Sequence, residues 1–156
     1  MDELYSRQIF DGHPYTHLCA QDHIPDSLIT IIGPSKTESL SGYRLGTAFG
    51  SAPLIDRMEE LQAIMDLRCG GYNQAVFRVW FDEPEGWMEE RVRQHQAVRD
   101  SMAEVFGQEE GISFRLTEGG SYFFVELPDL TVNLSELIQT ARRQAQVTVT
   151  PGTEFG

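Results

Sequence analysis

The stretch SLITIIGPSKTESLSGYRLGTAFG, residues 27–50, decides how the chain folds. Residues 27–33 form a short β-branched apolar run closed by Gly-Pro, which predicts a strand buried on both faces. Residues 43–50 predict a second strand with a glycine-punctuated end, returning antiparallel to the first. Between them lies Lys36, the only lysine of the chain, among Gly, Pro, Ser and Thr. This placement favours a chemical role for the lysine over the usual role of a solvated surface residue.

Downstream of residue 50 the apolar pattern changes from the period of a strand to that of a helix. Leu54, Met58, Leu61 and Met65 recur four, three and four residues apart, directly after Pro53. This spacing predicts an amphipathic helix with proline in its first turn. Two further helices are predicted, at residues 73–81 and 86–106.

The last third of the sequence is a different kind of unit. Strands are predicted at residues 112–116 and 121–127, on either side of Gly119-Gly120. Asn133 predicts the N-cap of a helix, and residues 147–152 predict a final strand. Strand-rich α/β structure, a long helix and a small α+β unit therefore follow one another along the chain.

Composition restricts the kind of partner. The chain has 156 residues and a formal net charge of -12, which argues against a nucleic-acid backbone or an anionic membrane as main partner. Its two cysteines are too few for a disulfide framework, and no apolar run reaches membrane-spanning length. We expect no nucleic-acid and no membrane partner, and a cytoplasmic location.

Lys36 and Arg44 are the first candidate site residues. An amine held at a fixed, partly desolvated point after a buried strand has the placement that a Schiff-base lysine needs. Arg44 lies between Gly42 and Gly46, which allow a ligand close to the backbone, and its guanidinium fork matches a phosphate.

The order of short motifs resembles one family. The chain is similar to the fold-type-I, class I/II aminotransferases that depend on pyridoxal 5'-phosphate (PLP). Four segments carry this resemblance in family order, spanning nearly the whole chain: DELY (2–5), PSKTESLSGYRLG (34–46), EGGSYFFVEL (118–127) and VTPGTEFG (149–156). The resemblance implies an enzyme that exchanges an amino group between an amino acid and a 2-oxo acid.

The resemblance also implies roles for individual residues. Lys36 would form the Schiff base with the cofactor and then move the proton at the substrate Cα. Asp2 would pair with the pyridine nitrogen, and Tyr5 would hydrogen-bond the phenolic oxygen of the ring. Arg44 would hold the phosphate, with Ser35 as a supporting polar contact.

The resemblance implies a domain plan as well. Residues 1–90 would be the C-terminal part of a PLP-binding large domain with a mostly parallel sheet, and residues 91–156 a truncated small α+β domain. The long helix near residues 87–106 would join them, and the intact enzyme would be a homodimer. We expect this segment alone to be inactive and to self-associate.

One departure from the family pattern concerns the phosphate. The family commonly has a hydroxyl residue three positions before the lysine, where this chain has Gly33. A backbone N–H could take over that contact, which predicts a weaker phosphate cup.

Several alternatives stay open. The same lysine serves lyase, decarboxylase and synthase reactions of the fold, and a non-catalytic truncated module is the alternative from another class. His13, His17, Cys19 and His23 lie close in sequence, but the prolines around them favour a solvated loop, so no metal is expected. Glu38 is expected to be an ordinary solvated carboxylate.

Overall fold

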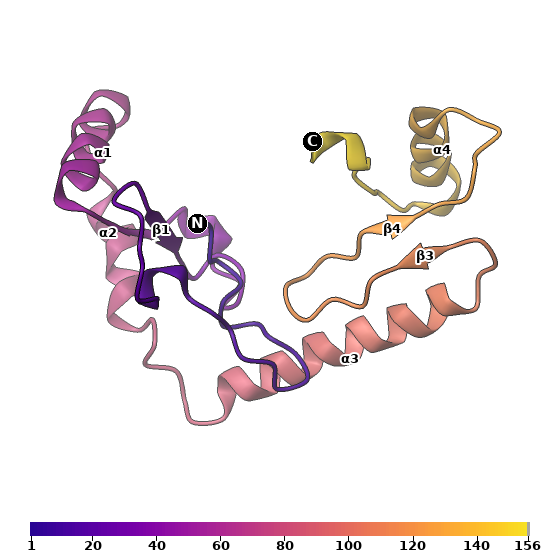
Figure 1. The fold of residues 1–156 in the computed structure, drawn as a ribbon, viewed down its shortest axis with the longest axis horizontal. Helices are drawn as coiled ribbons and strands as arrows, with labels where there is room; N and C mark the ends of the chain where they lie inside the picture. The colour runs from indigo at the N-terminus through magenta and orange to yellow at the C-terminus, as the bar shows by residue number, and fades with distance from the viewer. Residues whose placement is uncertain (156) are drawn as a thin grey trace. The chain divides into compact units, whose positions relative to one another are not determined.

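The structure is a computed structural model and describes residues 1–155. The chain divides into two compact units. The first comprises residues 1–98 together with 118–120, and the second comprises residues 99–117 and the chain from Ser121 onward. Helices and strands occur in the order shown in Figure 1.

A two-stranded antiparallel sheet forms the centre of the first unit. β1 (Ile29–Ile32) pairs with β2 (Thr47–Gly50), with Ile29 opposite Gly50. On the other side of β1, Asp2 forms a parallel bridge with Ile31. Within residues 1–155 the mostly parallel sheet expected from the sequence is thus present only as that single bridge.

Two details of the strand predictions were wrong. β1 is not buried on both faces, because the Ile31 side of the strand is open and this residue is 40% exposed. The second strand begins at Thr47 and not at residue 43. A 3-10 turn at Ser41–Tyr43 and the left-handed backbone of Arg44, with φ +50°, delay its start.

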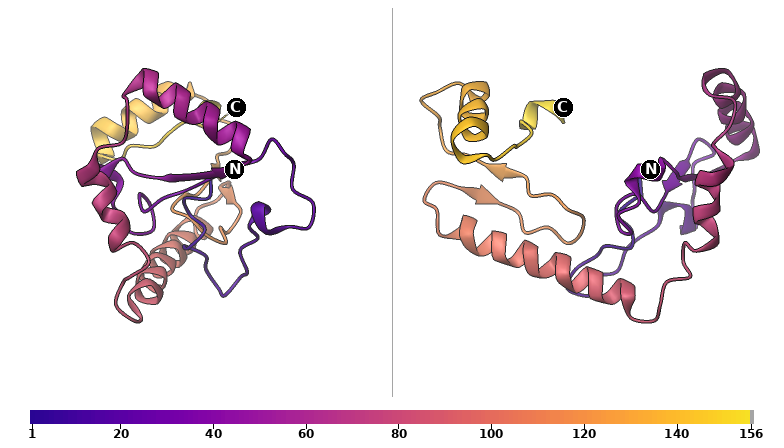
Figure 2. Two further views of the ribbon diagram at one scale, coloured as in Figure 1. Left: turned by 90° about the vertical axis from the view of Figure 1, so that its left-hand side faces the viewer. Right: turned by 180° about the vertical axis from the view of Figure 1, so that it is seen from behind.

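Helices complete the first unit. α1 (Ala52–Met65) begins with proline in its first turn, as predicted, and packs against β2. Figure 2 shows α1 running alongside the strand pair. The helix predicted at 73–81 is shorter and irregular: α2 (Gly71–Gln74) passes into a 3-10 turn at Ala75–Arg78. The long helix is α3 (Trp87–Gly107), close to its predicted bounds.

A distant segment, residues 118–120, pairs with the N-terminal segment of the first unit. Ile9 and Gly119 form an antiparallel bridge, the Phe10 N–H donates to Glu118 O (2.8 Å), and the Gly120 N–H donates to Gln8 O (3.0 Å). A Cβ at Gly119 would lie 2.6 Å from Gln8 O, closer than real Cβ atoms approach an oxygen. This pairing therefore requires glycine at position 119.

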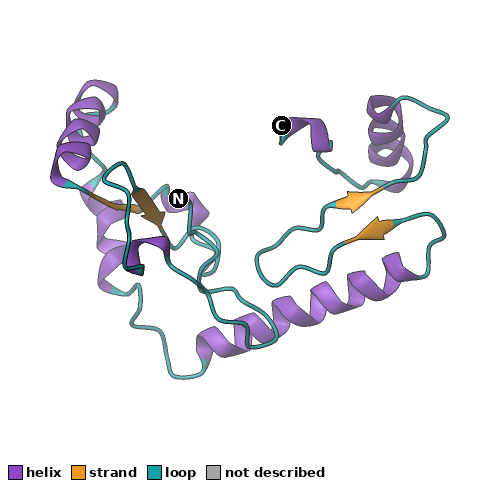
Figure 3. Ribbon diagram, viewed as in Figure 1, coloured by secondary structure: helices purple, strands orange, loops and turns teal. Residues whose placement is uncertain are grey.

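The second unit contains a small antiparallel sheet, visible in Figure 3. β3 (Ser113–Phe114) pairs with β4 (Val125–Glu126), as predicted but over fewer residues. Phe106, Phe114 and Phe123 meet edge to face with ring centroids 5.5–5.8 Å apart, a favoured arrangement of aromatic rings.

The C-terminal part of the second unit confirms one prediction and corrects another. α4 (Leu134–Thr140) has Asn133 as its N-cap, whose side chain accepts from the Ser135 N–H (2.8 Å). A π-type turn follows at Ala141–Ala145. The strand predicted at 147–152 does not form, and its last residue begins a 3-10 turn at Gly152–Glu154. Among the described residues, no helix has the length and apolar character needed to cross a membrane.

Candidate active site

The turn that carries Lys36 is closed by its own backbone. Gly33 and Pro34 are buried directly after β1, and Lys36 itself is half-buried. The Ser39 N–H donates to Lys36 O (3.2 Å), and the Leu40 N–H donates to Pro34 O (3.0 Å). These two hydrogen bonds hold the lysine at one point beyond the carboxyl end of the strand, where ligands bind in α/β sheets.

The N-terminal residues run beside the strand that leads to this turn. The Glu3 N–H donates to Ile31 O and the Ile31 N–H donates to Met1 O, both at 2.9 Å. Asp2 lies between these bonds, and its Oδ1 accepts from the Leu4 N–H (3.0 Å). The pairing brings the N-terminal acid and phenol toward the lysine, although about thirty residues separate them in sequence.

Lys36 and Tyr5 are brought together directly. Lys36 Nζ lies 5.7 Å from the centroid of the Tyr5 ring, within reach of a cation–π interaction. Gly120, which has φ +79°, also lies beside the Tyr5 ring. A Cβ at Gly120 would lie 3.7 Å from Tyr5 Cγ, an ordinary van der Waals distance, so it is the positive φ that favours glycine at this position.

Arg44 and Ser35 are positioned differently. Arg44 is exposed, and its Nη1 donates to Ser41 O (3.1 Å) in its own turn. Ser35 is half-buried next to Pro34.

Gly33 has a structural reason to be glycine. A Cβ at this position would lie 2.9 Å from Leu45 O and 3.2 Å from Gly46 Cα. The end of β1 and the return of the chain into β2 approach each other too closely for a side chain. A hydroxyl residue at this position would therefore force the turn open.

An ionic cluster lies behind the Lys36 turn and was not predicted from the sequence. Arg7 Nη1 donates to Glu38 Oε1 (2.6 Å), and the same guanidinium forks to Glu83 at 2.7 and 3.2 Å. Arg7 also lies over the ring of Phe81, 4.5 Å from its centroid. The expectation of a solvated Glu38 was wrong, since this side chain is only 4% exposed.

Other residues tie the same turn to the segment before and within α3. Trp80 Nε1 donates to Glu38 Oε1 (3.2 Å), and the Thr37 hydroxyl donates to Glu38 Oε2. Arg91 Nε donates to Thr37 O (2.8 Å), and its Nη2 donates to the Ser39 hydroxyl (2.7 Å). Each of the three residues after Lys36 is therefore anchored by a side chain from elsewhere in the chain.

The sequence offered only a weak signal for this cluster. Glu38 is the one acid in the turn that carries Lys36, and Arg7 follows Tyr5 by two residues. Neither feature shows that the two would meet, because they are 31 residues apart.

The Glu83 carboxyl gives the cluster a dependence on pH. Hydrogen bonding from the Arg7 guanidinium lowers the pKa of Glu83 below its ordinary value. A carboxyl with a lowered pKa stabilises the fold above the unfolded-state pKa of about 4.3, and this contribution is lost as pH falls through the lower, folded-state pKa.

We therefore expect Glu83→Gln to lower the free energy of unfolding of the full-length protein at pH 7 by roughly 1–2 kcal/mol. This is the contribution of a charged hydrogen bond, reduced because the pair is partly exposed to solvent. As pH falls below about 4 and through the lowered pKa of Glu83, the variant and the unmodified protein should converge. Urea denaturation across pH measures this. Glu60→Gln is the matched control, because Glu60 pairs with Arg57 on an exposed helix face. An equal deficit at acid and neutral pH would contradict the assignment.

His17 contacts a buried acid. Its Nδ1 lies 2.6 Å from Glu3 Oε2, and the Glu3 side chain is fully buried. Among the described residues, no group of three His, Cys, Asp or Glu side chains could hold a metal ion.

A cavity of about 210 Å³ adjoins the His17–Glu3 pair and the Lys36 turn, and its lining includes Leu4, Arg7, Gly33 and Thr37.

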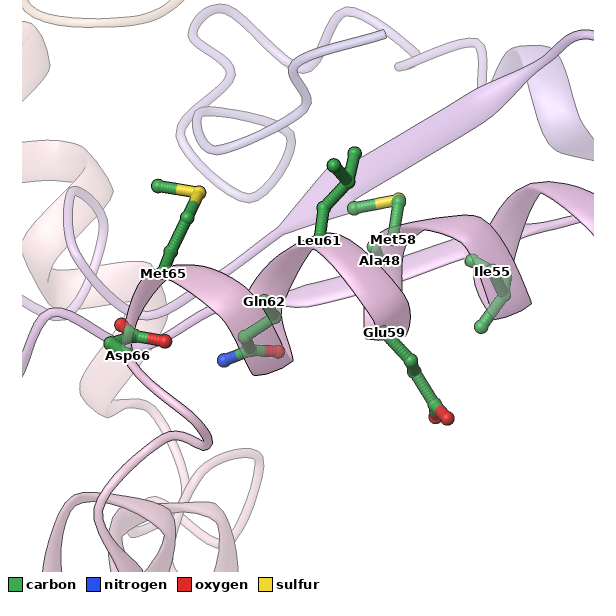
Figure 4. Close-up of a pocket in the computed structure, with 8 residues that line it drawn as sticks. All are labelled: Ala48, Ile55, Met58, Glu59, Leu61, Gln62, Met65 and Asp66. Atoms are coloured by element: carbon green, nitrogen blue, oxygen red, sulfur yellow. The ribbon is translucent and has the colours of Figure 1, made fainter.

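A larger groove of about 420 Å³ lies over α1 and β2, away from the predicted site residues. Figure 4 shows Met58, Leu61 and Met65 projecting from α1 beside Ala48, with Glu59 pointing away from them. Its lining is largely apolar and contains none of the five predicted site residues.

Known proteins of one family match nearly the whole chain. The family model described as aminotransferase class I and II matches residues 1–156. An aspartate aminotransferase of Rhizobium meliloti (strain 1021) is 24% identical, over 100% of this chain and 41% of the relative. The crystal structure of an aspartate aminotransferase from Rhodobacter sphaeroides 2.4.1 is 54% identical with a TM-score of 0.95, covering 99% of this chain and 39% of that one.

A more distant structure shares the fold. Cystalysin from Treponema denticola, described as containing a pyridoxal 5'-phosphate cofactor, is 18% identical with a TM-score of 0.86, over 99% of this chain and 40% of that one. The α/β class predicted from the sequence is confirmed by these likenesses. The chain spans about two fifths of the length of the relatives it matches.

Proposed function

Because this chain belongs to the class I and II aminotransferase family, we propose that the full-length protein carrying it transfers an amino group between an amino acid and a 2-oxo acid. The cofactor is pyridoxal 5'-phosphate, and Lys36 is the residue that attaches to it. One structural observation supports the proposal above the others: the Lys36 amine lies 5.7 Å from the Tyr5 ring, in a turn fixed by hydrogen bonds.

The residues present suit this cofactor. A carboxylate, a phenol and an amine follow or adjoin neighbouring strands, and their sequence order is the one expected for the ring-binding residues. When bound, the cofactor supplies an aldehyde that condenses with amines and a ring that accepts electrons from the substrate Cα. Asp2 is the partner for the ring nitrogen, and Tyr5 is the donor for the ring hydroxyl oxygen.

Lys36 has two tasks in this proposal. Its amine first holds the cofactor in place, and after substrate binding it moves the proton at the substrate Cα. The second task requires the freed amine to stay within hydrogen-bond distance of that carbon. The closed turn and the neighbouring Tyr5 ring restrict where the amine can go.

Arg44 and Ser35 are proposed for the phosphate. Arg44 is exposed and uses one guanidinium nitrogen in its own turn, so the rest of the fork is available for an anion. We place residues 1–90 in the large cofactor-binding domain and residues 91–156 in the small domain. We also propose that the full-length protein is a homodimer.

The experiment that tests the function is cofactor labelling in the full-length protein. Incubation with PLP should give an absorption band in the near-ultraviolet to blue that disappears on borohydride reduction. Peptide mapping should then find the label on Lys36, the only lysine in these 156 residues. Amino-group transfer from a panel of amino acids to 2-oxo acids completes the test. A label elsewhere, or no band at all, would overturn the proposal.

A further inference from the structure

We propose that Glu38 is a positioning residue for Lys36, and that the cluster of Arg7, Trp80 and Arg91 acts on the lysine by fixing the turn that carries it. This inference rests on the function proposed for Lys36. It concerns residues outside the predicted cofactor contacts. Each of these four residues is proposed to act through the backbone of the turn and not through a contact with the Lys36 amine.

The turn after Lys36 depends on these anchors. Glu38 receives hydrogen bonds from Arg7 (2.6 Å), Trp80 (3.2 Å) and the Thr37 hydroxyl, so both of its carboxylate oxygens are used. Ser39, the next residue, has φ +58°, a left-handed backbone that a serine adopts at a cost. Arg91 contacts the hydroxyl of this same residue (2.7 Å).

Arg7 and Arg91, which contact the Lys36 turn, are each held in place by further contacts. The Arg7 fork is completed by Glu83, and its guanidinium lies over Phe81. The Arg91 guanidinium lies 4.9 Å from the centroid of the Trp87 ring. Both arginines therefore connect the Lys36 turn to residues 80–91, a stretch that ends within the first turns of α3.

Position is what this site needs from its lysine. The amine must reach the cofactor and then the substrate Cα, and a misplacement of about 1 Å costs on the order of 100-fold in rate. Glu38 points into the cluster, so its influence on the amine passes through the backbone of the turn. That distinguishes a positioning residue from one that touches the reacting atoms.

A glutamine at position 38 removes the charge with little change of shape. One of the two oxygen acceptors is replaced by an amide NH2, which cannot accept. Arg7 and Trp80 share one carboxylate oxygen and Thr37 uses the other, so the remaining amide oxygen cannot serve both sides. Arg7 keeps its fork to Glu83, so no buried charge is left alone. The change therefore loosens the turn without removing the ion pair behind it.

The test uses the full-length protein with PLP bound, as Glu38→Gln, with Glu60→Gln as the matched control on an exposed pair. We expect kcat to fall about 10- to 100-fold while KM changes less than about threefold. The pH midpoint of the bound-cofactor absorbance should shift, and the control should show neither effect. Trp80→Phe, which removes only one donor to Glu38, should give a smaller loss in the same direction.

A second readout needs neither cofactor nor turnover. Amide hydrogen exchange of the unloaded protein should speed up about tenfold at Ser39 and Leu40, whose N–H groups close the turn. Unchanged kcat and unchanged exchange in Glu38→Gln would overturn the proposal. So would a lower melting temperature with normal kcat and absorbance in the folded protein. If the unmodified protein shows no cofactor band, the proposed function fails, and the positioning role fails with it.

Discussion

The full-length protein with Lys36→Ala is expected to transfer amino groups at least about 10⁴-fold more slowly than the unmodified protein. General acid–base catalysis by one side chain contributes on the order of 10²–10⁴, and the covalent attachment is lost with the same amine. Lys36 is half-buried and its charged group is not part of the ionic cluster, so the fold should survive. Steady-state turnover and far-ultraviolet circular dichroism measure the two expectations separately.

Lys36→Arg is the control for charge. Arginine keeps a cation beside the Tyr5 ring but cannot attach to the cofactor or release a proton near neutral pH. We expect it to be as inactive as the alanine variant while binding PLP without a covalent bond. Residual turnover above about 1% in either variant would remove Lys36 from the catalytic role.

Asp2→Ala is expected to have the second-largest effect, lowering kcat by roughly 10²–10³, the magnitude typical of one lost electrostatic contact in a transition state. The proposed reason is that the ring nitrogen loses its charged partner, and the ring then accepts electrons poorly. The cofactor should stay bound, because Lys36 still holds it. Cofactor content measured by absorbance and kcat measured with saturating PLP test both statements.

Arg44→Ala provides the contrasting control. A charge-assisted hydrogen bond to a phosphate is worth about 1.5–3 kcal/mol, so this variant should bind PLP roughly 10- to 150-fold more weakly. Saturating PLP should restore most of its turnover, unlike that of the Asp2 variant. If the Asp2 variant were the one rescued by cofactor, the two roles would have been exchanged.

Local patterns in the sequence were sufficient to predict most of the helices and strands. Pro53 and the apolar spacing after it located α1, and Asn133 located the start of α4. The approach of Tyr5 to Lys36 followed from motif order and not from periodicity. Errors occurred where backbone conformation decides: Arg44 adopts a left-handed φ that no apolar pattern reveals, and this shortened β2.

The ionic cluster could not be predicted because its partners are chosen by tertiary packing. A glutamate such as Glu38 in a turn is usually solvated, and burial alone separates this one from an ordinary surface carboxylate. Gly119 is a similar case. Glycine is required there because Gln8 O would lie 2.6 Å from a Cβ at this position. Nothing in the sequence around Gly119 indicates that Gln8 packs against it.

The anchoring of the Lys36 turn has a consequence for the order of folding. The bonds that hold the turn join residues 31, 54 and 76 positions apart, through Arg7–Glu38, Arg91–Thr37 and Arg7–Glu83. Contacts this distant form late, because the chain must close long loops before it gains from them. On the ribosome the turn cannot acquire its final geometry until residue 91 has emerged. Local elements such as α1 can form earlier, so the cofactor attachment that we propose for Lys36 should follow secondary structure in refolding.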